Sequence, residues 1–192
     1  MPIFPHSFFS ASSNESGRRL YWPTLLLTLW ILSSAFFARD LYNLGVAIVG
    51  THIEWMLWGL LLAVPMAGIP LWKTLPGTYR IWRMAGLLLL TVPTVMFILF
   101  FAEAISEKMH LIYMGILAWL VQRDLRYGTP RSTAILNLGT TFFFCLLVAA
   151  LDETLQYFIP DRVGDPRDLL FAPVGALWGG LSYLTCYGVR PR

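Results

Sequence analysis

The chain alternates long apolar runs with short polar segments over almost its whole length. An α-helix needs about 20 apolar residues to cross the hydrocarbon core of a bilayer, and irregular backbone cannot face lipid there. The pattern therefore predicts an all-α fold, a polytopic transmembrane helical bundle of six spans. The six apolar runs lie at 21–38, 53–72, 84–104, 108–123, 133–157 and 169–188.

The third and fourth runs almost touch. One continuous helix over 84–123 would be far too long for a bilayer, since each residue adds about 1.5 Å. We therefore expect Glu103 to Lys108 to form a turn at a membrane interface.

Composition agrees with this pattern. Hydrophobic residues make up 57% of the 192 residues and charged residues only 13%, against about 25% charged in soluble domains. Six spans would use nearly the whole length, which leaves no room for a separate soluble domain. The net charge of +3 is informative because of where the basic residues lie along the chain, and we expect no nucleic-acid partner.

The basic residues alternate between successive connections. Ten lie in the N-terminal tail, in the second and fourth connections and in the C-terminal tail, beside only two acids. The other three connections hold four basic residues against nine acids. Basic segments stay in the cytoplasm. This predicts a multi-pass protein of the bacterial cytoplasmic membrane with both termini inside.

Four segments follow along the chain. Residues 1–20 are polar and Ser-rich, and we expect a flexible cytoplasmic tail followed by an uncleaved first span. Residues 21–83 form a transmembrane hairpin, residues 84–188 a four-span core and residues 189–192 a short tail. Cys145 and Cys186 fall inside apolar runs, which favours packed thiols over a disulfide. Small residues at steps of four in the last span favour close helix packing within the protein over dimerisation.

Polar side chains gather in the connections that face outward. Glu153 and Gln156 share a helical face with Asp152 beside them, and Glu107 and His110 recur three residues apart. Any one of these groups is explained by a solvated span end, because the insertion penalty falls toward the interface. Together, two distant segments would bring carboxylates, an imidazole and an amide to one membrane face.

These residues resemble the motifs of the VanZ-like family. The stretch from Asp152 to Arg162, DETLQYFIPDR, is similar to an acid, a Gln three residues on and a Pro-Gly-Arg, with Asp168 and Gly175 behind it. Residues 107–110, EKMH, with Tyr113 and Leu117 behind them, resemble an acidic-Lys pair followed by His. The resemblance covers residues 84–188. Asp161 replaces the usual Gly and Ala172 the usual Asn, which puts an intact family activity in doubt.

The resemblance implies a cell-envelope role, because the founding member is associated with low-level teicoplanin antibiotic resistance. We expect a polar outer-face site for an amphiphilic or lipid-linked envelope ligand, with Arg162 holding its phosphate or carboxylate. Expected partners are membrane lipids or lipid-linked precursors, with another membrane protein as a further candidate. The expected ligand-binding residues are Glu107, Lys108, His110, Glu153, Gln156, Arg162 and Asp168.

Two alternatives stay open. A membrane-embedded enzyme could use His110 as a general base beside Glu107 and act on a lipid phosphate, although the chain has no specific nucleophile or metalloprotease motif. Alternatively, the chain is a structural subunit of a membrane complex, and the charges only hold the fold. Histidine and carboxylate spacing along the chain is unspecific, so we expect no cofactor and no metal.

Overall fold

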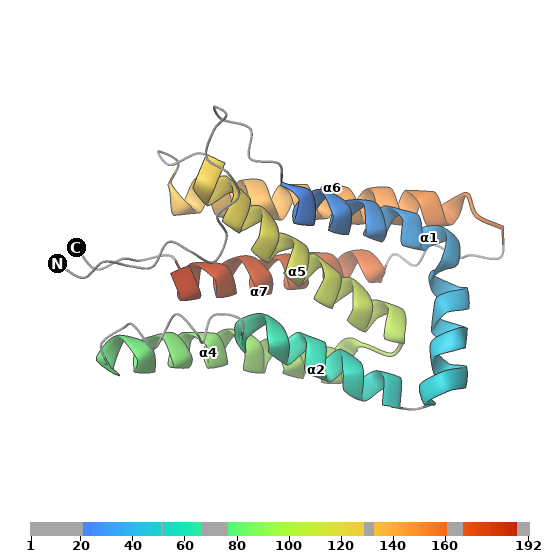
Figure 1. The fold of residues 1–192 in the computed structure, drawn as a ribbon, viewed down its shortest axis with the longest axis horizontal. Helices are drawn as coiled ribbons and strands as arrows, with labels where there is room; N and C mark the ends of the chain where they lie inside the picture. The colour runs from blue at the N-terminus through green and yellow to red at the C-terminus, as the bar shows by residue number, and fades with distance from the viewer. Residues whose placement is uncertain (1–20, 51, 67–76, 129–132, 161–166, 188–192) are drawn as a thin grey trace.

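The computed structural model describes residues 21–50, 52–66, 77–128, 133–160 and 167–187. None of these residues forms a strand, which confirms the all-α fold. Figure 1 shows helices that run back and forth along one axis, each roughly antiparallel to the next. The helices are α1 (Trp22–Val49), α2 (His52–Met66), α4 (Gly77–Phe101), α5 (Ile105–Gly128), α6 (Ala134–Tyr157) and α7 (Asp168–Tyr187).

Four of these helices, α1, α4, α6 and α7, are long and apolar enough to cross a membrane. Helix α5 has 24 residues but carries charged residues in its first and last turns. Helix α2 has only 15 residues. The polytopic helical bundle is therefore confirmed, while the six-span count and the orientation stay predictions.

The predicted turn between the third and fourth runs is present. Helix α4 ends at Phe101 and α5 begins at Ile105, so the break is shorter than expected. The carboxylate of Glu107 accepts hydrogen bonds from the backbone N–H groups of Glu103 (2.6 Å) and Ala104 (3.0 Å). A Glu in the first helical turn that reaches back to free backbone donors defines a helix start.

Helix α5 lies at the centre of the bundle, in direct contact with α7. A Cβ atom added to Gly179 would lie 1.9 Å from the carbonyl oxygen of Gly115, and one added to Gly175 would lie 2.2 Å from that of Leu111. The two backbones therefore touch, which only glycine allows. This confirms the predicted use of the small residues of α7 for packing inside the protein.

The first helix belongs to the same core. Ile31 of α1 is buried together with Met114 of α5 and Cys145 of α6. Both cysteines are free and buried, as expected. Helix α1 thus packs on α5 and α6, although the motifs begin only after it. The division into a hairpin at 21–83 and a four-span core stays a prediction.

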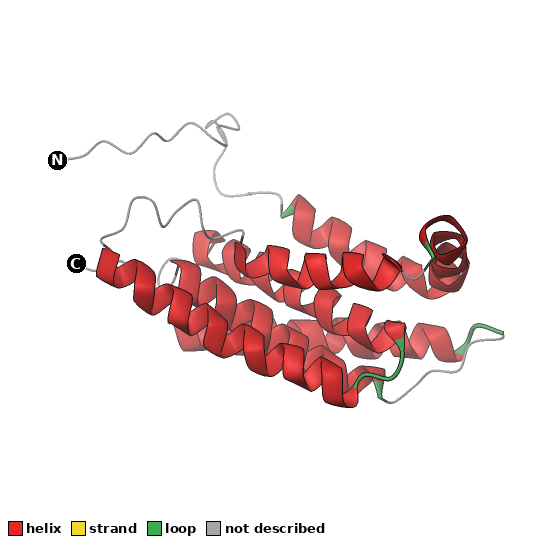
Figure 2. Ribbon diagram, turned by 90° about the horizontal axis from the view of Figure 1, so that it is seen from below, coloured by secondary structure: helices red, strands yellow, loops and turns green. Residues whose placement is uncertain are grey.

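The last part of α1 leaves the direction of the other helices. Figures 1 and 2 show that α1 turns sharply and that its C-terminal part crosses the end of the bundle at which α2 begins. The straight part is the one that packs on α5 and α6 through Ile31, and Ala35 of this part is also buried. The predicted apolar run stops at residue 38, before Arg39 and Asp40, so the helix continues beyond the predicted end as far as Val49.

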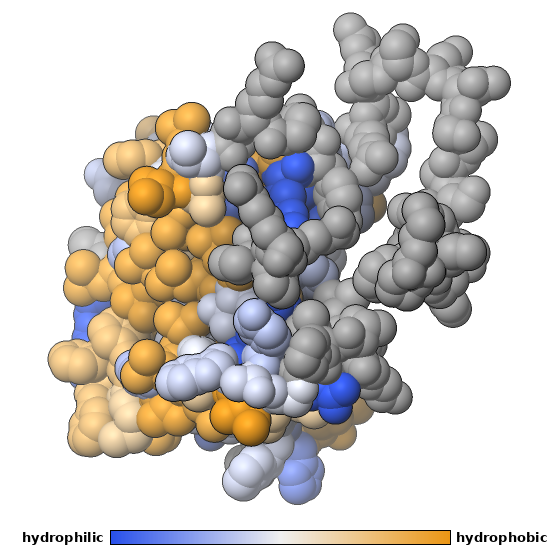
Figure 3. All heavy atoms as spheres, turned by 90° about the vertical axis from the view of Figure 1, so that its left-hand side faces the viewer, coloured by the Kyte–Doolittle hydropathy of each residue, from blue (hydrophilic) through white to orange (hydrophobic). Residues whose placement is uncertain are grey.

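The two ends of the bundle differ in charge. At one end, Arg83 and Arg126 donate hydrogen bonds to the backbone carbonyls of Cys186 and Tyr187, where cations are favourable because α7 ends there. Figure 3 faces this end and shows an apolar flank beside hydrophilic groups gathered nearer the middle. The opposite end holds the acidic residues described below. The positive-inside rule depends on such an excess of Lys and Arg at one end.

Topology can be tested by labelling in intact cells. A cysteine in place of Asp165 should react with an impermeant thiol reagent, and a cysteine in place of Thr78 should not. The native thiols will not interfere, because Cys145 and Cys186 are 0% and 1% exposed. Labelling at 78 and not at 165 would mean that the orientation is inverted.

Candidate functional site

A cluster of buried polar side chains lies where the first turn of α5, the last turns of α6 and the first turn of α7 meet. Its centre is His110 of α5. The imidazole Nε2 lies 3.0 Å from Asp152 Oδ2 and 3.5 Å from Glu153 Oε1, both on α6. The other ring nitrogen, Nδ1, lies 3.5 Å from Asp168 Oδ2 of α7. One imidazole therefore contacts three carboxylates from two other helices.

Local helix geometry positions each member. The Nε2 amide of Gln156 donates to Asp152 Oδ2 at 3.1 Å, a contact between residues four apart on α6. Asp168 is the first residue of α7, where the helix dipole favours a carboxylate. His110 Nδ1 also lies 3.3 Å from the backbone oxygen of Ser106, one turn earlier on α5.

The cluster is buried although it lies at helix ends. Exposed fractions range from 2% for Asp152 to 9% for His110, with Asp168 at 4%. Buried charges cost free energy unless they are paired or hydrogen-bonded. A bundle that keeps this many ionisable groups out of water at one end needs them to contact one another or a bound species.

One basic and two acidic side chains lie beside the cluster. Arg167 lies 3.5 Å from Glu107 Oε1 and 3.0 Å from Glu103 Oε2. Glu107 is buried, whereas Glu103 is exposed. The hydrogen bond and the positive charge of Arg167 hold the pKa of the Glu103 carboxyl below its usual value. Arg167 therefore ties the turn between α4 and α5 to the start of α7.

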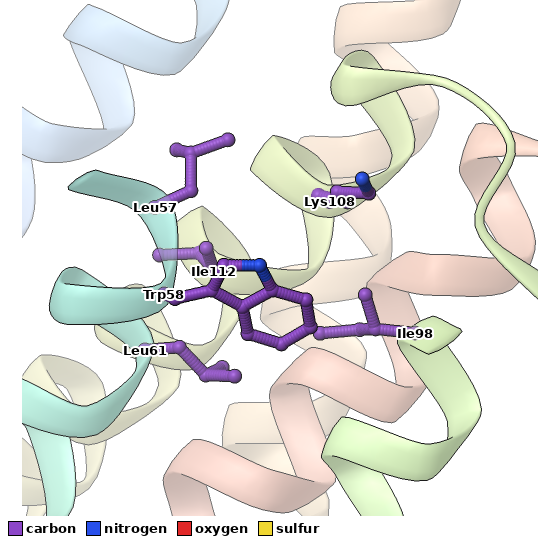
Figure 4. A pocket seen from close by; sticks show the side chains of 6 residues that line it. All are labelled: Leu57, Trp58, Leu61, Ile98, Lys108 and Ile112. Carbon is purple, nitrogen blue, oxygen red and sulfur yellow. The ribbon is translucent and has the colours of Figure 1, made fainter. Parts of the chain in front are cut away.

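Lys108 points away from the cluster. Its Nζ lies 3.2 Å from Glu54 of α2. Figure 4 shows it at one side of a small apolar pocket, in which the indole of Trp58 reaches from α2 toward Ile98 of α4. The pocket is lined by Leu57, Trp58, Leu61, Ile98, Lys108 and Ile112.

The structure thus places the predicted site residues in three groups. His110, Glu153, Gln156 and Asp168 form the cluster, and Glu107 lies beside it at the same end of the bundle. This confirms the predicted convergence of two segments that lie about forty residues apart. Lys108 faces α2, and Arg162 lies outside the described residues. A ligand-binding role for these residues stays a prediction.

Asp152 has more contacts than the sequence predicted, since the helical pattern placed it only beside the face that Glu153 and Gln156 share. The structure puts it between His110 and Gln156, in contact with both. The four-residue step from Asp152 to Gln156 was the signal that could have identified it. Ala172, at the position where the family motif has Asn, is fully buried in the apolar core, so a small apolar residue suits this packing. Asp161 lies outside the described residues.

The contacts of His110 limit what the cluster can do. A carboxylate 3.0 Å from one ring nitrogen orients the imidazole and selects its tautomer. The other nitrogen faces the Ser106 carbonyl and Asp168. It donates a hydrogen bond to them when it carries a proton, and in the neutral ring its lone pair can accept a proton or bind a cation. The remaining carboxylates can accept hydrogen bonds from hydroxyl or amine groups of a ligand.

Apolar helices around a buried acidic and histidine cluster define a polytopic membrane protein with a polar site at one end. A family model described as VanZ/LLP1 matches residues 4–187 of the chain. The chain therefore belongs to the VanZ/LLP1 family. The match includes α1 and α2, and so extends beyond residues 84–188 that carry the recognisable motifs. No curated protein and no solved structure matches the chain.

Proposed function

We propose that this protein binds the polar head of an amphiphilic, lipid-linked envelope ligand at the outer face of the bacterial cytoplasmic membrane. The observation that carries the proposal is the convergence of His110, Asp152, Glu153 and Asp168 in one buried cluster. If these polar groups served only to terminate three helices, they would point into water and lipid headgroups. These turn toward one another, beneath a surface that lipid can reach.

The head of such a ligand has an anionic and a hydrogen-bonding part. Arg162 lies in the connection from α6 to α7, and its planar guanidinium suits a phosphate or carboxylate. Gln156 and Glu153 are suited to orient amide or hydroxyl groups of the same head. Lys108 pairs with Glu54 on the α2 side of this end, so it would contact the ligand only by leaving that carboxylate.

The lipid chain requires an apolar path beside the head. The pocket between α2, α4 and α5 lies next to Lys108 and is lined by Leu57, Trp58 and Ile98. The pocket is too small to enclose a lipid chain, so the chain would lie outside it, against the exposed apolar side chains of α2 and α4. Membership of the VanZ/LLP1 family supports a ligand from the cell envelope.

Photo-crosslinking tests where the ligand binds. A photoreactive phenylalanine analogue replaces either Phe158, beside the cluster, or Trp82, near the opposite end of the bundle. The two side chains are matched in exposure, at 75% and 73%. Radiolabelled polyprenyl phosphate should be captured at 158 and not at 82, and excess unlabelled polyprenyl phosphate should abolish capture while phosphatidylcholine should not. Equal capture at both positions would contradict the proposal and favour nonspecific contact with lipid.

The short distance between His110 and Asp152 favours hydrolysis of a lipid phosphate as a second candidate function. In that reaction His110 would take a proton from water as the water oxygen attacks phosphorus. The bond from phosphorus to the lipid oxygen would break, and His110 would return the proton to that oxygen, which leaves as the lipid alcohol. Release of inorganic phosphate from polyprenyl phosphate by purified protein distinguishes this function, because a binding protein returns the lipid intact. Loss of release in His110→Gln, with release retained in Glu54→Gln, would assign it to this cluster.

A further inference from the structure

We propose that His110, Glu153 and Asp168 bind a divalent transition-metal ion. Each residue offers one ligand atom, and these atoms all lie within 4.8 Å of one another. The three residues come from α5, α6 and α7, and all three are buried. Charged groups at a solvated helix end would not be gathered in this way.

The distances around the imidazole fit an ion. Asp152 Oδ2 and Glu153 Oε1 lie 3.0 Å and 3.5 Å from Nε2 of His110, and Asp168 Oδ2 lies on the Nδ1 side. In the tautomer with its proton on Nε2, the Nδ1 lone pair would bind the ion beside Asp168, and Glu153 would reach the ion from the other side of the ring. Nδ1 and Asp168 Oδ2 are 3.5 Å apart. Two ligands of a tetrahedral ion at about 2.1 Å lie about 3.4 Å from each other.

In this arrangement Asp152 would not bind the ion itself but would hydrogen-bond to the histidine that does. Metal-binding histidines commonly donate their second ring N–H to a carboxylate, which fixes the tautomer and makes the imidazole a better ligand. Gln156 in turn donates to Asp152 Oδ2 at 3.1 Å. The remaining oxygen, Asp152 Oδ1, is buried and has no hydrogen-bond partner within the described ranges. Water on a bound ion would supply one.

Charge favours the same conclusion. Three carboxylates contact one imidazole, and even an imidazolium balances only one of them. Several buried anions beside one another are costly. Glu153 and Asp168 also interact with other groups of the protein, and a divalent cation would add the charge that balances two carboxylates at once.

The donor set indicates which ion. One imidazole with two carboxylates is a ligand set for Zn²⁺ or Mn²⁺, since imidazole suits transition metals and carboxylates suit harder ions. Three protein ligands leave a coordination position for water or an anionic group. The sequence led us to expect no metal, because the spacing of ligands along the chain is unspecific, and the fold now brings them together from three helices.

Elemental analysis of the full chain in detergent tests the site. Protein stripped with EDTA is loaded with Zn²⁺ or Mn²⁺ and desalted. The wild type should retain one ion per chain and unfold at a higher temperature when loaded, because an ion that binds only the folded state stabilises it. The near-isosteric variants Glu153→Gln and Asp168→Asn should lose more affinity than the roughly 10–100-fold that outer-shell changes cost.

Glu54→Gln is the matched control, since Glu54 is a carboxylate at the same end that pairs with Lys108. It should retain the ion. A folded wild type that retains no ion would overturn the proposal and point to a side chain such as Arg162 as the compensating cation. Retention by both folded cluster variants would overturn it equally. Should either variant fail to fold, His110→Gln provides the same comparison. The assay contains no added lipid ligand, so its result stands apart from the crosslinking result.

Discussion

Gly179→Ala is expected to destabilise the bundle by at least about 3 kcal/mol, the upper part of the range for overpacked sites. A Cβ atom at this position would lie 1.9 Å from the carbonyl oxygen of Gly115. The obstacle is backbone of α5, so no side-chain rotation can make room. Helices α5 and α7 would have to separate along their whole contact, including the cluster end at Leu111 and Gly175. Thermal unfolding of purified protein in detergent measures the effect.

Gly139→Ala provides the matched control. It is also a Gly-to-Ala change inside an apolar helix, α6, but a Cβ atom there would meet nothing within 4 Å. Alanine is a better helix former than glycine by about 0.5–1 kcal/mol. This variant should therefore unfold at or slightly above the wild-type temperature. Similar unfolding temperatures for the two variants would mean that α5 and α7 are not in backbone contact.

The second large effect is expected for Glu107→Ala, at about 2–4 kcal/mol. The Glu107 side chain is only 2% exposed. It accepts hydrogen bonds from two backbone N–H groups of the turn and lies 3.5 Å from Arg167. Removing it deletes two part-buried hydrogen bonds to a charged acceptor, each worth about 1.5–3 kcal/mol, and weakens the pairing of Arg167.

Glu103→Ala is the control for this change. Glu103 is also an acid that pairs with Arg167, but its side chain is 77% exposed. Exposed ion pairs contribute little to stability because water screens them, so this variant should unfold close to the wild-type temperature. Equal losses in the two variants would show that pairing with Arg167, and not the helix start at Ile105, carries the effect.

Local patterns predicted the helices and the main break well. The apolar runs differ from the observed helices mainly at their ends, because capping by groups such as Glu107 fixes a helix start more tightly than hydrophobicity does. The break between Phe101 and Ile105 followed from membrane thickness alone. The C-terminal part of α1 did not, because Arg39 and Asp40 interrupt the apolar run, although apolar residues resume at Leu41 and continue to Val49.

The candidate site was predictable in part. His110 and Glu153 could be assigned to one membrane end by counting charges in the connections, since each lies close to the end of a predicted span. The direction of Lys108 could not be, because it depends on Glu54, on a helix whose position the motifs do not specify. The contact of His110 with three carboxylates depends on how α5 packs against α6 and α7. That packing depends on glycines of α7 that touch the backbone of α5. No sequence pattern shows which backbone those glycines contact.

Thermal unfolding of wild type and Arg162→Ala, with and without polyprenyl phosphate, tests most directly whether the cluster end binds a lipid-linked anion. A ligand that binds only the folded state raises the unfolding temperature by mass action. The account predicts that Arg162→Ala unfolds close to the wild type without lipid and loses the shift that lipid gives. Arg80→Ala, a change at the opposite end, should keep that shift. Equal lipid shifts in wild type and Arg162→Ala, or an Arg162→Ala protein that does not fold, would contradict the account and leave the cluster a structural network.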